Sequence, residues 1–290
     1  MKKLFYFLPV VLCLGIIGFA WAQRSQKMSV LNQAIIKAKS QQIEKEIAQL
    51  KDHPWAGQYY FGDGLGANVS LTLAPKNGFT IVWHGCMGLY DQNHGTVEWD
   101  EDKNILKMSF AFEVEKEYYI GRYASEYKPI RWGERVYLIP ANEIVQFCNE
   151  INSGSEPRKG LWGESFLRRG DEKKETQGKP VLPEEFMSCL FDEPVDAAIT
   201  SVKGVRETRD ITDSPVFITT VVISKGKKDG LVPDMKLYVM EPEDIFESMK
   251  LTKVEETQSE GEFHIWSSGT RKTPTPVEGW QLSTRPRWRR

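Results

Sequence analysis

The stretch 68-NVSLTLAPKNGFTIVW-83 decides the fold of this chain. Its apolar residues occupy every second position, first from Val69 to Leu73 and then from Phe79 to Trp83. A period of two is the pattern of a strand that buries one face. Between the two runs, Pro75-Lys76-Asn77-Gly78 is a turn sequence whose glycine suits a positive φ. The stretch therefore predicts an antiparallel hairpin.

The same alternation continues downstream of the hairpin. It returns at Val97–Trp99 and Leu106–Phe112, and further strands are expected over Glu117–Tyr123 and Glu134–Ile139. About six or seven short strands at this spacing are typical of an antiparallel sandwich or an up-and-down barrel. We therefore expect residues 53–140 to form an antiparallel β domain.

Upstream of the β domain, the period is helical. Apolar residues from Val30 to Leu50 recur every three or four positions among Gln, Lys and Glu, and Asp52-His53-Pro54 ends the pattern. Residues 23–52 therefore predict an amphipathic helix that packs on its own domain or stands as a stalk. The positions from Ile36 to Leu50 also fit a coiled-coil seam, but the match is too short to favour that alternative.

The first 22 residues indicate export. Lys2 and Lys3 precede an unbroken apolar run from Leu4 to Phe19, and Ala20-Trp21-Ala22 offers small residues for signal cleavage after position 22. The predicted location is periplasmic or secreted. The alternative is an uncleaved anchor in the inner membrane formed by residues 4–22, which approach the length needed to span a bilayer. Lipid attachment at Cys13 is disfavoured because a large leucine precedes it.

Composition indicates a globular chain with a sizeable core. The 290 residues are 40% hydrophobic and 11% aromatic, with a formal net charge of −2 that gives no reason to expect a nucleic-acid partner. Cleavage after residue 22 would leave Cys86, Cys148 and Cys189, so at most one internal disulfide could form. The chain is therefore no disulfide-stapled scaffold.

The middle of the chain, residues 141–195, predicts a helical connector with a loop. Ala141–Ile151 carries apolar residues on one helical face, with Gly154 as a stop signal. Asp171–Pro180 is charged and predicts a solvated excursion, and Pro183-Glu184-Glu185 opens a short helix.

The last third returns to strands and ends in a basic tail. Strands are expected over Ala197–Val205, Val216–Ser224 and Leu237–Met240, which gives a small β domain at residues 196–270. In the tail, residues 271–290, four arginines and a tryptophan crowd the last six positions. We expect a solvated end there, with contact to anionic lipid or glycan as the alternative.

Two resemblances accompany these patterns. The segment 221-VVISKGKKDGLVPDMKLYV-239, followed by Lys253-Val254-Glu255-Glu256, resembles a strand–turn–strand unit of small β-barrel modules in bacterial envelope assembly proteins, such as rod-shape-determining and flagellar-assembly factors. In that unit a glycine usually stands where this chain has Asp234. The resemblance implies a structural or assembly module and brings no catalytic residue with it.

The second resemblance rests on the first β domain. Trp55-Ala56-Gly57-Gln58-Tyr59, together with the segments Gly62–Asn68 and Gly85–Asp91, is similar to a set of exported bacterial proteins of unknown function. That likeness implies a location outside the cytoplasm and no activity.

A candidate metal site lies between Trp83 and Gly95. His84, Cys86, Asp91 and His94 fall within eleven residues, and imidazole, thiolate and carboxylate are ligands that zinc or copper prefer. The same residues could hold a thiol nucleophile beside an imidazole. The alternative is a glycine-rich turn from Gly85 to Gly95 whose polar residues bond to the local backbone.

A nucleotide loop is disfavoured. Gly62, Gly64 and Ala67 match the dinucleotide fingerprint by letter, but that fingerprint requires a following helix, and a strand is expected here. A tight turn or bulge is the preferred interpretation.

The aromatic residues of the first β domain could line a barrel that holds an apolar ligand, or they could fill its core. They are Trp83, Trp99, Phe110, Phe112, Tyr118, Tyr119 and Trp132.

The sequence thus predicts a mainly β chain, α+β overall, with an N-terminal helix, an antiparallel β sandwich or barrel, a helical connector and a small C-terminal β-barrel-like domain. The expected function is that of an exported cell-envelope protein acting by binding or assembly, with an envelope protein or the membrane surface as partner. The alternatives are a metal-dependent or thiol hydrolase centred on His84, Cys86, Asp91 and His94, and a carrier of a small apolar ligand.

Overall fold

The computed structural model describes residues 32–62, 64, 67–86, 88–112, 123–159, 164–210, 213–266 and 275–287. The expected signal or anchor, residues 1–22, lies outside this part of the chain, as does most of the strand expected at Glu117–Tyr123. Within the described residues, no helix combines the length and the apolar character needed to cross a membrane.

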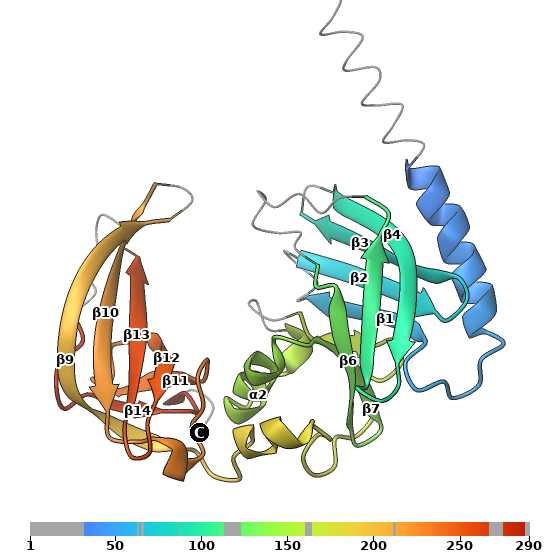
Figure 1. The fold of residues 1–290 in the computed structure, drawn as a ribbon. Coiled ribbons are helices and arrows are strands. Elements are labelled where there is room, and N and C mark those ends of the chain that lie inside the picture. Colours follow the sequence, from blue (N-terminus) through green and yellow to red (C-terminus); the bar gives the residue numbers. More distant parts are fainter. Residues whose placement is uncertain are drawn as a thin grey trace, which may run out of the picture.

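The first β domain is a closed, eight-stranded, antiparallel barrel (Figure 1). Neighbours in sequence are neighbours in the sheet, and the last strand pairs with the first. The strands are β1 (Gly57–Gly62), β2 (Ala67–Ala74), β3 (Gly78–Gly85), β4 (Gly88–Asp100), β5 (Ile105–Phe110), β6 (Glu126–Trp132), β7 (Arg135–Pro140) and β8 (Phe166–Arg168). The mainly β prediction is confirmed, and the barrel is the arrangement adopted.

The β2–β3 hairpin has the predicted register. Val69 pairs with Trp83 and Leu73 pairs with Phe79, and Gly78 adopts a φ of 69° in the turn. Because residues directly opposite each other share a face of the sheet, the alternating apolar residues all point into the barrel. Eight strands leave an interior about wide enough for such side chains to fill. Large residues that are fully buried there include Tyr59, Leu71, Phe79, Ile81, Tyr127 and Phe166.

An amphipathic helix over residues 32–47 lies along the outside of this barrel (Figure 1). Ile36 and Ile43 are buried, and the Ser40 hydroxyl is 2.9 Å from that of Thr80 on β3. The Glu46 carboxylate accepts hydrogen bonds from the backbone amides of Lys76 and Asn77 in the β2–β3 turn, at 2.8 and 2.9 Å. The helix therefore packs on its own domain through the face that also fitted a coiled-coil seam.

The connector region contains α2 (Ile144–Asn152), the short 3-10 helices η1 (Pro157–Lys159) and η2 (Glu184–Cys189), and the barrel strand β8. The expectation of a solvated excursion at Asp171–Pro180 is wrong at its start. The Asp171 side chain is buried and accepts a hydrogen bond from the Val136 amide at 2.9 Å, and Arg135 donates to two carbonyls of the same loop. These bonds hold the loop against β7.

The second β domain is a closed barrel of six strands in the order β10-β13-β12-β11-β14-β9. The strands are β9 (Asp196–Arg209), β10 (Pro215–Ile223), β11 (Lys236–Glu241), β12 (Ser248–Val254), β13 (Ser259–Trp266) and β14 (Gln281–Ser283), and η3 (Lys227–Asp229) follows β10. Asp234, at the position where the envelope modules usually have glycine, adopts a φ of 69°. That left-handed conformation is the one glycine enters at no steric cost.

A solvated tail was expected at the basic end of the chain. The described residues of that end, 275–287, are instead attached to the fold. Residues 281–283 form β14, which bridges β11 and β9 and so closes the second barrel. Arg285 then donates from Nε to the carbonyl of Asn152 in α2 at 3.3 Å.

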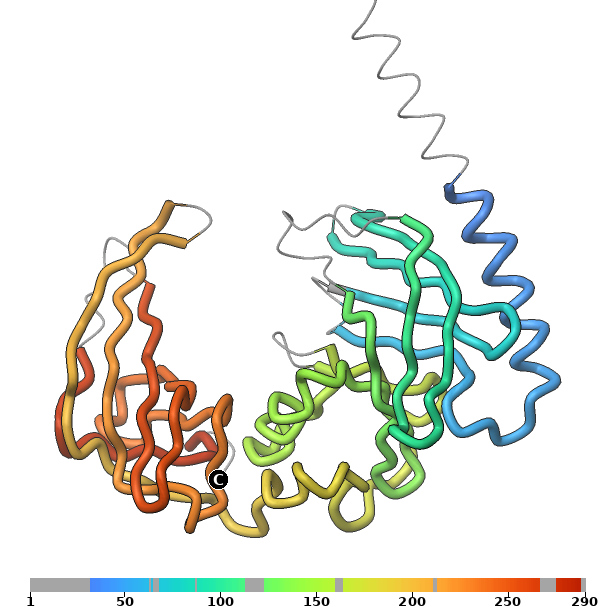
Figure 2. The backbone as a smooth tube through the Cα atoms, in the orientation of Figure 1, coloured from blue at the N-terminus to red at the C-terminus, as the bar shows by residue number. Residues whose placement is uncertain are grey.

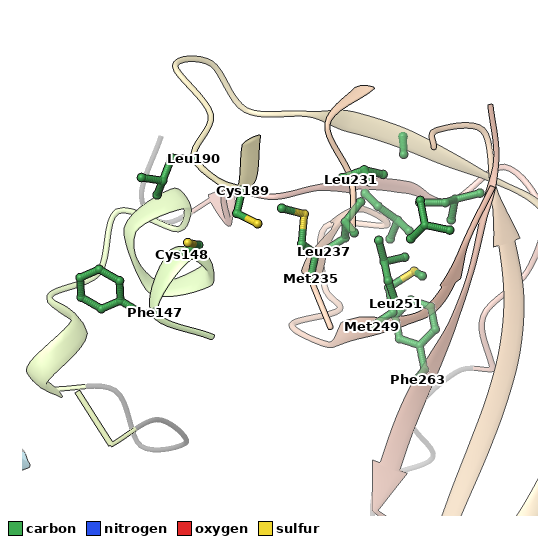
Figure 3. Close-up of a cluster of buried hydrophobic side chains, with 14 of the residues drawn as sticks. Phe147, Cys148, Cys189, Leu190, Leu231, Met235, Leu237, Met249, Leu251 and Phe263 are labelled. Atoms are coloured by element: carbon green, nitrogen blue, oxygen red, sulfur yellow. The ribbon is translucent and has the colours of Figure 1, made fainter. Parts of the chain in front are cut away.

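Helix α2 joins the two barrels, and Figure 2 shows the connecting segments running between them. Phe147 packs on Tyr137 of β7, with ring centroids 5.4 Å apart. On the other side, Asn149 donates from Nδ2 to the Asp234 carbonyl and accepts from the Lys236 amide, both at 3.0 Å. The outer face of β7, α2, η2 and the interior of the second barrel therefore share one buried apolar cluster (Figure 3).

Candidate functional site

Four connections meet at one end of the first barrel. In an up-and-down barrel, the β1–β2, β3–β4, β5–β6 and β7–β8 connections all lie at the same end, because successive strands reverse direction. The opposite end carries the short turns, and there Trp55 is buried. We call the end that carries the four connections the loop end.

At the loop end of the barrel, the pairing between β3 and β4 is irregular. Trp83 pairs with Asp91, but His84 pairs with Leu89, so Tyr90 is the extra residue of a bulge. The Tyr90 ring lies 4.8 Å from that of Trp83, over Gly85, where a β-carbon would lie 1.8 Å from the ring. Gly85 is thus required for the close approach of this ring, and the bulge turns it across Trp83.

The indole Nε1 of Trp83 is a hydrogen-bond donor that is buried at this end and has no partner within the described residues. The hydroxyl of Tyr123 is also buried, and it interacts with the carboxylate of Asp91. Trp83 is 7% exposed and Tyr123 is 8% exposed. Both residues pack in the apolar interior of the barrel, where Phe110 stacks on Tyr123 at 6.2 Å. A buried polar atom without a partner costs about 1–3 kcal/mol, so the Trp83 indole requires an explanation.

Carboxylates lie close to these two side chains. Burial raises the pKa of the Tyr123 hydroxyl, and the charge of Asp91 together with the hydrogen bond to its carboxylate raises that pKa further. Tyr127 donates to Glu164, which lies just before β8, at 3.2 Å. Burial raises the pKa of Glu164 to about 7, and the neighbouring carboxylate of Glu143 acts in the same direction.

These five residues come from four separate stretches of the barrel. We call them the polar end: Trp83, Asp91, Tyr123, Tyr127 and Glu164. Chemically, the polar end offers one free donor, a tyrosine hydroxyl that interacts with Asp91, and the carboxyl groups of Asp91 and Glu164 at the rim of an aromatic interior. Such a combination of an apolar wall with a few convergent polar groups is characteristic of small-molecule sites.

The four proposed metal ligands do not come together. His84 is exposed at the end of β3, and Cys86 lies in the turn beyond it. Among the described residues, no group of three or more His, Cys, Asp or Glu side chains could hold a metal ion. Asp91 lies opposite Trp83 on the inner face of the sheet, whereas His94 lies opposite Thr80 on the outer face, beneath the N-terminal helix. Burial lowers the pKa of His94, and the charge of Lys39 lowers it further.

The alternative interpretation of this segment as a turn is also wrong. Gly88 to Gly95 belongs to β4, and its paired register with β3 explains why. The expected local bonds are nevertheless present, since the Gln92 amide donates to Asp91 at 2.7 Å and the His94 amide donates to Asn93 at 2.8 Å. These carboxylate and amide side chains thus serve the strand rather than a loop.

The aromatic residues expected to line a barrel divide into four groups. Trp83, Trp99 and Phe110 belong to the interior cluster. Phe112 packs against His94, with ring centroids 5.3 Å apart. Trp132 lies outside the barrel, against the apolar cluster at the joint, and donates to the Gly178 carbonyl at 2.8 Å. Tyr118 and Tyr119 lie outside the described residues.

Sequence reasoning missed Tyr123, Tyr127 and Glu164 as members of a site. Tyr127 begins a strand that was not expected, and Glu164 is one of many acidic residues, 40 in all, with no distinguishing spacing. Only closure of the barrel by β8 brings Glu164 to Tyr127.

Comparison with known proteins supplies no assignment for this site. No protein-family model matches the chain, and no match to it was found among curated proteins or solved structures.

Proposed function

We propose that this chain is an exported binding protein of the bacterial cell envelope, and that the polar end of the first barrel holds its ligand. The observation that carries the proposal is the buried indole Nε1 of Trp83, which has no hydrogen-bond partner within the described residues and lies at one end of the barrel interior. A bound hydrogen-bond acceptor would satisfy it. The apolar leader in residues 1–22 and the resemblance of the second barrel to envelope assembly modules support the location.

The ligand class follows from the side chains. The Trp83 indole calls for an acceptor such as a carbonyl oxygen, and the aromatic interior favours an apolar body. The charge of Asp91 acts at Tyr123 in the same end of the barrel, so a negatively charged ligand would be repelled. The site therefore suits a small, neutral, largely apolar molecule with a carbonyl-type acceptor.

The test uses prodan, a neutral naphthalene ketone whose emission reports an apolar environment. We expect saturable binding to the full chain, and about tenfold weaker binding to Trp83→Phe, because one lost hydrogen bond is worth roughly 1 kcal/mol or slightly more. Trp266→Phe is the matched control, since Trp266 is an exposed residue of the second barrel. The anionic dye 1-anilinonaphthalene-8-sulfonate should bind the wild type more weakly than prodan.

The outcomes separate the two parts of the proposal. Equal prodan affinity for the wild type and Trp83→Phe would exclude the polar end as the ligand site. Native mass spectrometry of the protein recovered from the periplasm tests the location. The expected result is the mass of a chain that begins at Gln23. A protein found only in the cytoplasm would contradict export without bearing on the prodan result.

A further inference from the structure

Two cysteines from distant parts of the chain meet at the joint between the barrels. Cys148 lies on α2 and Cys189 is the last residue of η2, and the residues are 0% and 1% exposed. Both are free thiols, and their mutual interaction raises the pKa of Cys148 and lowers the pKa of Cys189. Figure 3 shows the two side chains in the same apolar cluster, between α2 and the second barrel.

A third side chain, that of Asn152, holds the backbone around Cys189 against α2. Asn152, one helical turn beyond Cys148, donates from Nδ2 to the Cys189 carbonyl at 2.8 Å and accepts from the Phe191 amide at 3.1 Å. Both bonds lie on the face of α2 that carries Cys148. The backbone around Cys189 is therefore held against the helix independently of the two sulfur atoms.

The alternative explanation for the two buried cysteines is that they only fill the core, since a buried cysteine behaves as a small apolar residue. It does not require two thiols from distant parts of the chain to lie near enough to shift each other's pKa. The remaining described cysteine, Cys86, is exposed in the β3–β4 turn at the loop end of the first barrel. Among the described cysteines, the structure thus leaves one pairing.

We propose that Cys148 and Cys189 form a disulfide bond in the exported protein. The proposal rests on the export part of the proposed function, because such bonds persist in oxidising compartments such as the periplasm. The bond would tie α2, the helix that joins the barrels, to the segment that leads into β9.

The reaction is thiol–disulfide exchange with an oxidised dithiol oxidoreductase or oxidised glutathione. The Cys189 thiolate attacks one sulfur of the oxidant, forms a mixed disulfide and releases the first thiolate of the oxidant. The Cys148 thiolate then attacks the Cys189 sulfur, forms the Cys148–Cys189 bond and releases the second thiolate. The two protons lost by the cysteines are taken up by the released thiolates, and the oxidant gains the two electrons.

The order of attack follows from the unequal pKa values of the two thiols. Their interaction raises the pKa of Cys148, as does burial, and it lowers the pKa of Cys189. Cys189 is therefore the better first nucleophile. Because both residues are buried, the exchange takes place while the chain is folding or while the joint is transiently open.

The experiment refolds the full chain from urea in a glutathione buffer of oxidising composition, blocks free thiols with iodoacetamide and digests without reduction. Trypsin cleavage at Lys and Arg predicts that Cys148 lies in peptide 136–158 and Cys189 in peptide 175–203. We expect these two peptides to appear linked, with a mass two hydrogen atoms below the sum of the thiol forms. Peptide 77–103, which holds Cys86, should be fully alkylated.

Variants make the result specific. Cys148→Ser should abolish the linked species and leave Cys189 alkylated, whereas Cys86→Ser should leave the link intact. The oxidised wild type should also unfold at a higher urea concentration than the reduced wild type, and Cys148→Ser should show no such shift.

Recovery of Cys148 and Cys189 in alkylated form from the correctly refolded wild type would overturn the proposal, as would a link from either one to Cys86. The proposed export is tested separately, on protein isolated from cells with its thiols trapped at lysis. A pair that links during refolding in vitro but is found reduced in cells would support the pairing and contradict the export on which its use depends.

Discussion

Replacement of Asn149 by alanine should weaken the junction between the two barrels. The Asn149 residue is 4% exposed, and its amide group makes one donor and one acceptor bond to the backbone beside β11, both at 3.0 Å. Asn149→Ala leaves the Lys236 N–H and the Asp234 carbonyl without these partners. At about 1–3 kcal/mol for each buried group, with partial relief by water, the expected loss is about 2–4 kcal/mol of unfolding free energy.

Urea unfolding monitored by far-ultraviolet circular dichroism and tryptophan fluorescence measures this loss. With a slope of about 3 kcal/mol per molar urea, the midpoint should fall by roughly 1 M. Because the lost bonds lie between α2 and the second barrel, we also expect the two barrels to unfold in separate steps in the variant. Asn142→Ala is the matched control, since Asn142 is exposed just before the same helix.

The reasoning would be refuted by an Asn149→Ala midpoint equal to that of the Asn142→Ala control. If the midpoint falls by about 1 M but both barrels still unfold in a single step, the estimated loss of free energy is confirmed. The view that these bonds couple the two barrels would then be contradicted.

Three further predictions concern charge and backbone conformation. Glu46→Gln should lose about 1–3 kcal/mol of stability at neutral pH, because the carboxylate accepts charge-assisted bonds from the β2–β3 turn. Although burial opposes ionisation, those bonds lower the pKa of Glu46 below 4.5, so the difference from the wild type in urea titrations should shrink as the pH falls through the lowered pKa. Asp234→Gly should raise the thermal midpoint by the equivalent of about 0.5–1 kcal/mol, since glycine suits a φ of 69°, and a lower midpoint would count against that view. The raised pKa of Glu164, about 7, means that the folded state takes up a proton more readily than the unfolded state, so wild-type stability should fall by about 1–3 kcal/mol as the pH rises from about 5 to about 8. Glu164→Gln should flatten that profile in chemical denaturation, and an unchanged profile would place the titration elsewhere.

Two of the missed strands are too short to be recognised from a periodic pattern. β2 and β3 are each eight residues long, enough for four inward and four outward positions to display the alternation. β8 and β14 have three residues each, too few to show any period, yet each closes a barrel. Their existence depends on strand edges presented by the rest of the fold, which local sequence does not contain.

Only part of the polar end could be predicted from the sequence, for a similar physical reason. Asp91 was recognised as a polar residue in an unusual segment, but its neighbours in sequence suggested a metal, whereas the strand places His94 on the opposite face. The bulge at Tyr90 and the arrival of Glu164 beside Tyr127 are products of long-range pairing. Residues that are remote in sequence carry no mutual signal in a single chain.

The position of β14 sets a limit on when the second barrel can be completed. A chain that emerges from the ribosome or a secretion channel delivers β9 at residue 196, but the strand that seals its free edge comes only at residues 281–283. Until then β9 and β11 each present open backbone groups to any neighbouring strand, a situation that invites aggregation. The first barrel, by contrast, has received all its strands by residue 168. Loss of a few residues near the C-terminus should therefore harm assembly of the second barrel far more than their small share of the contacts suggests.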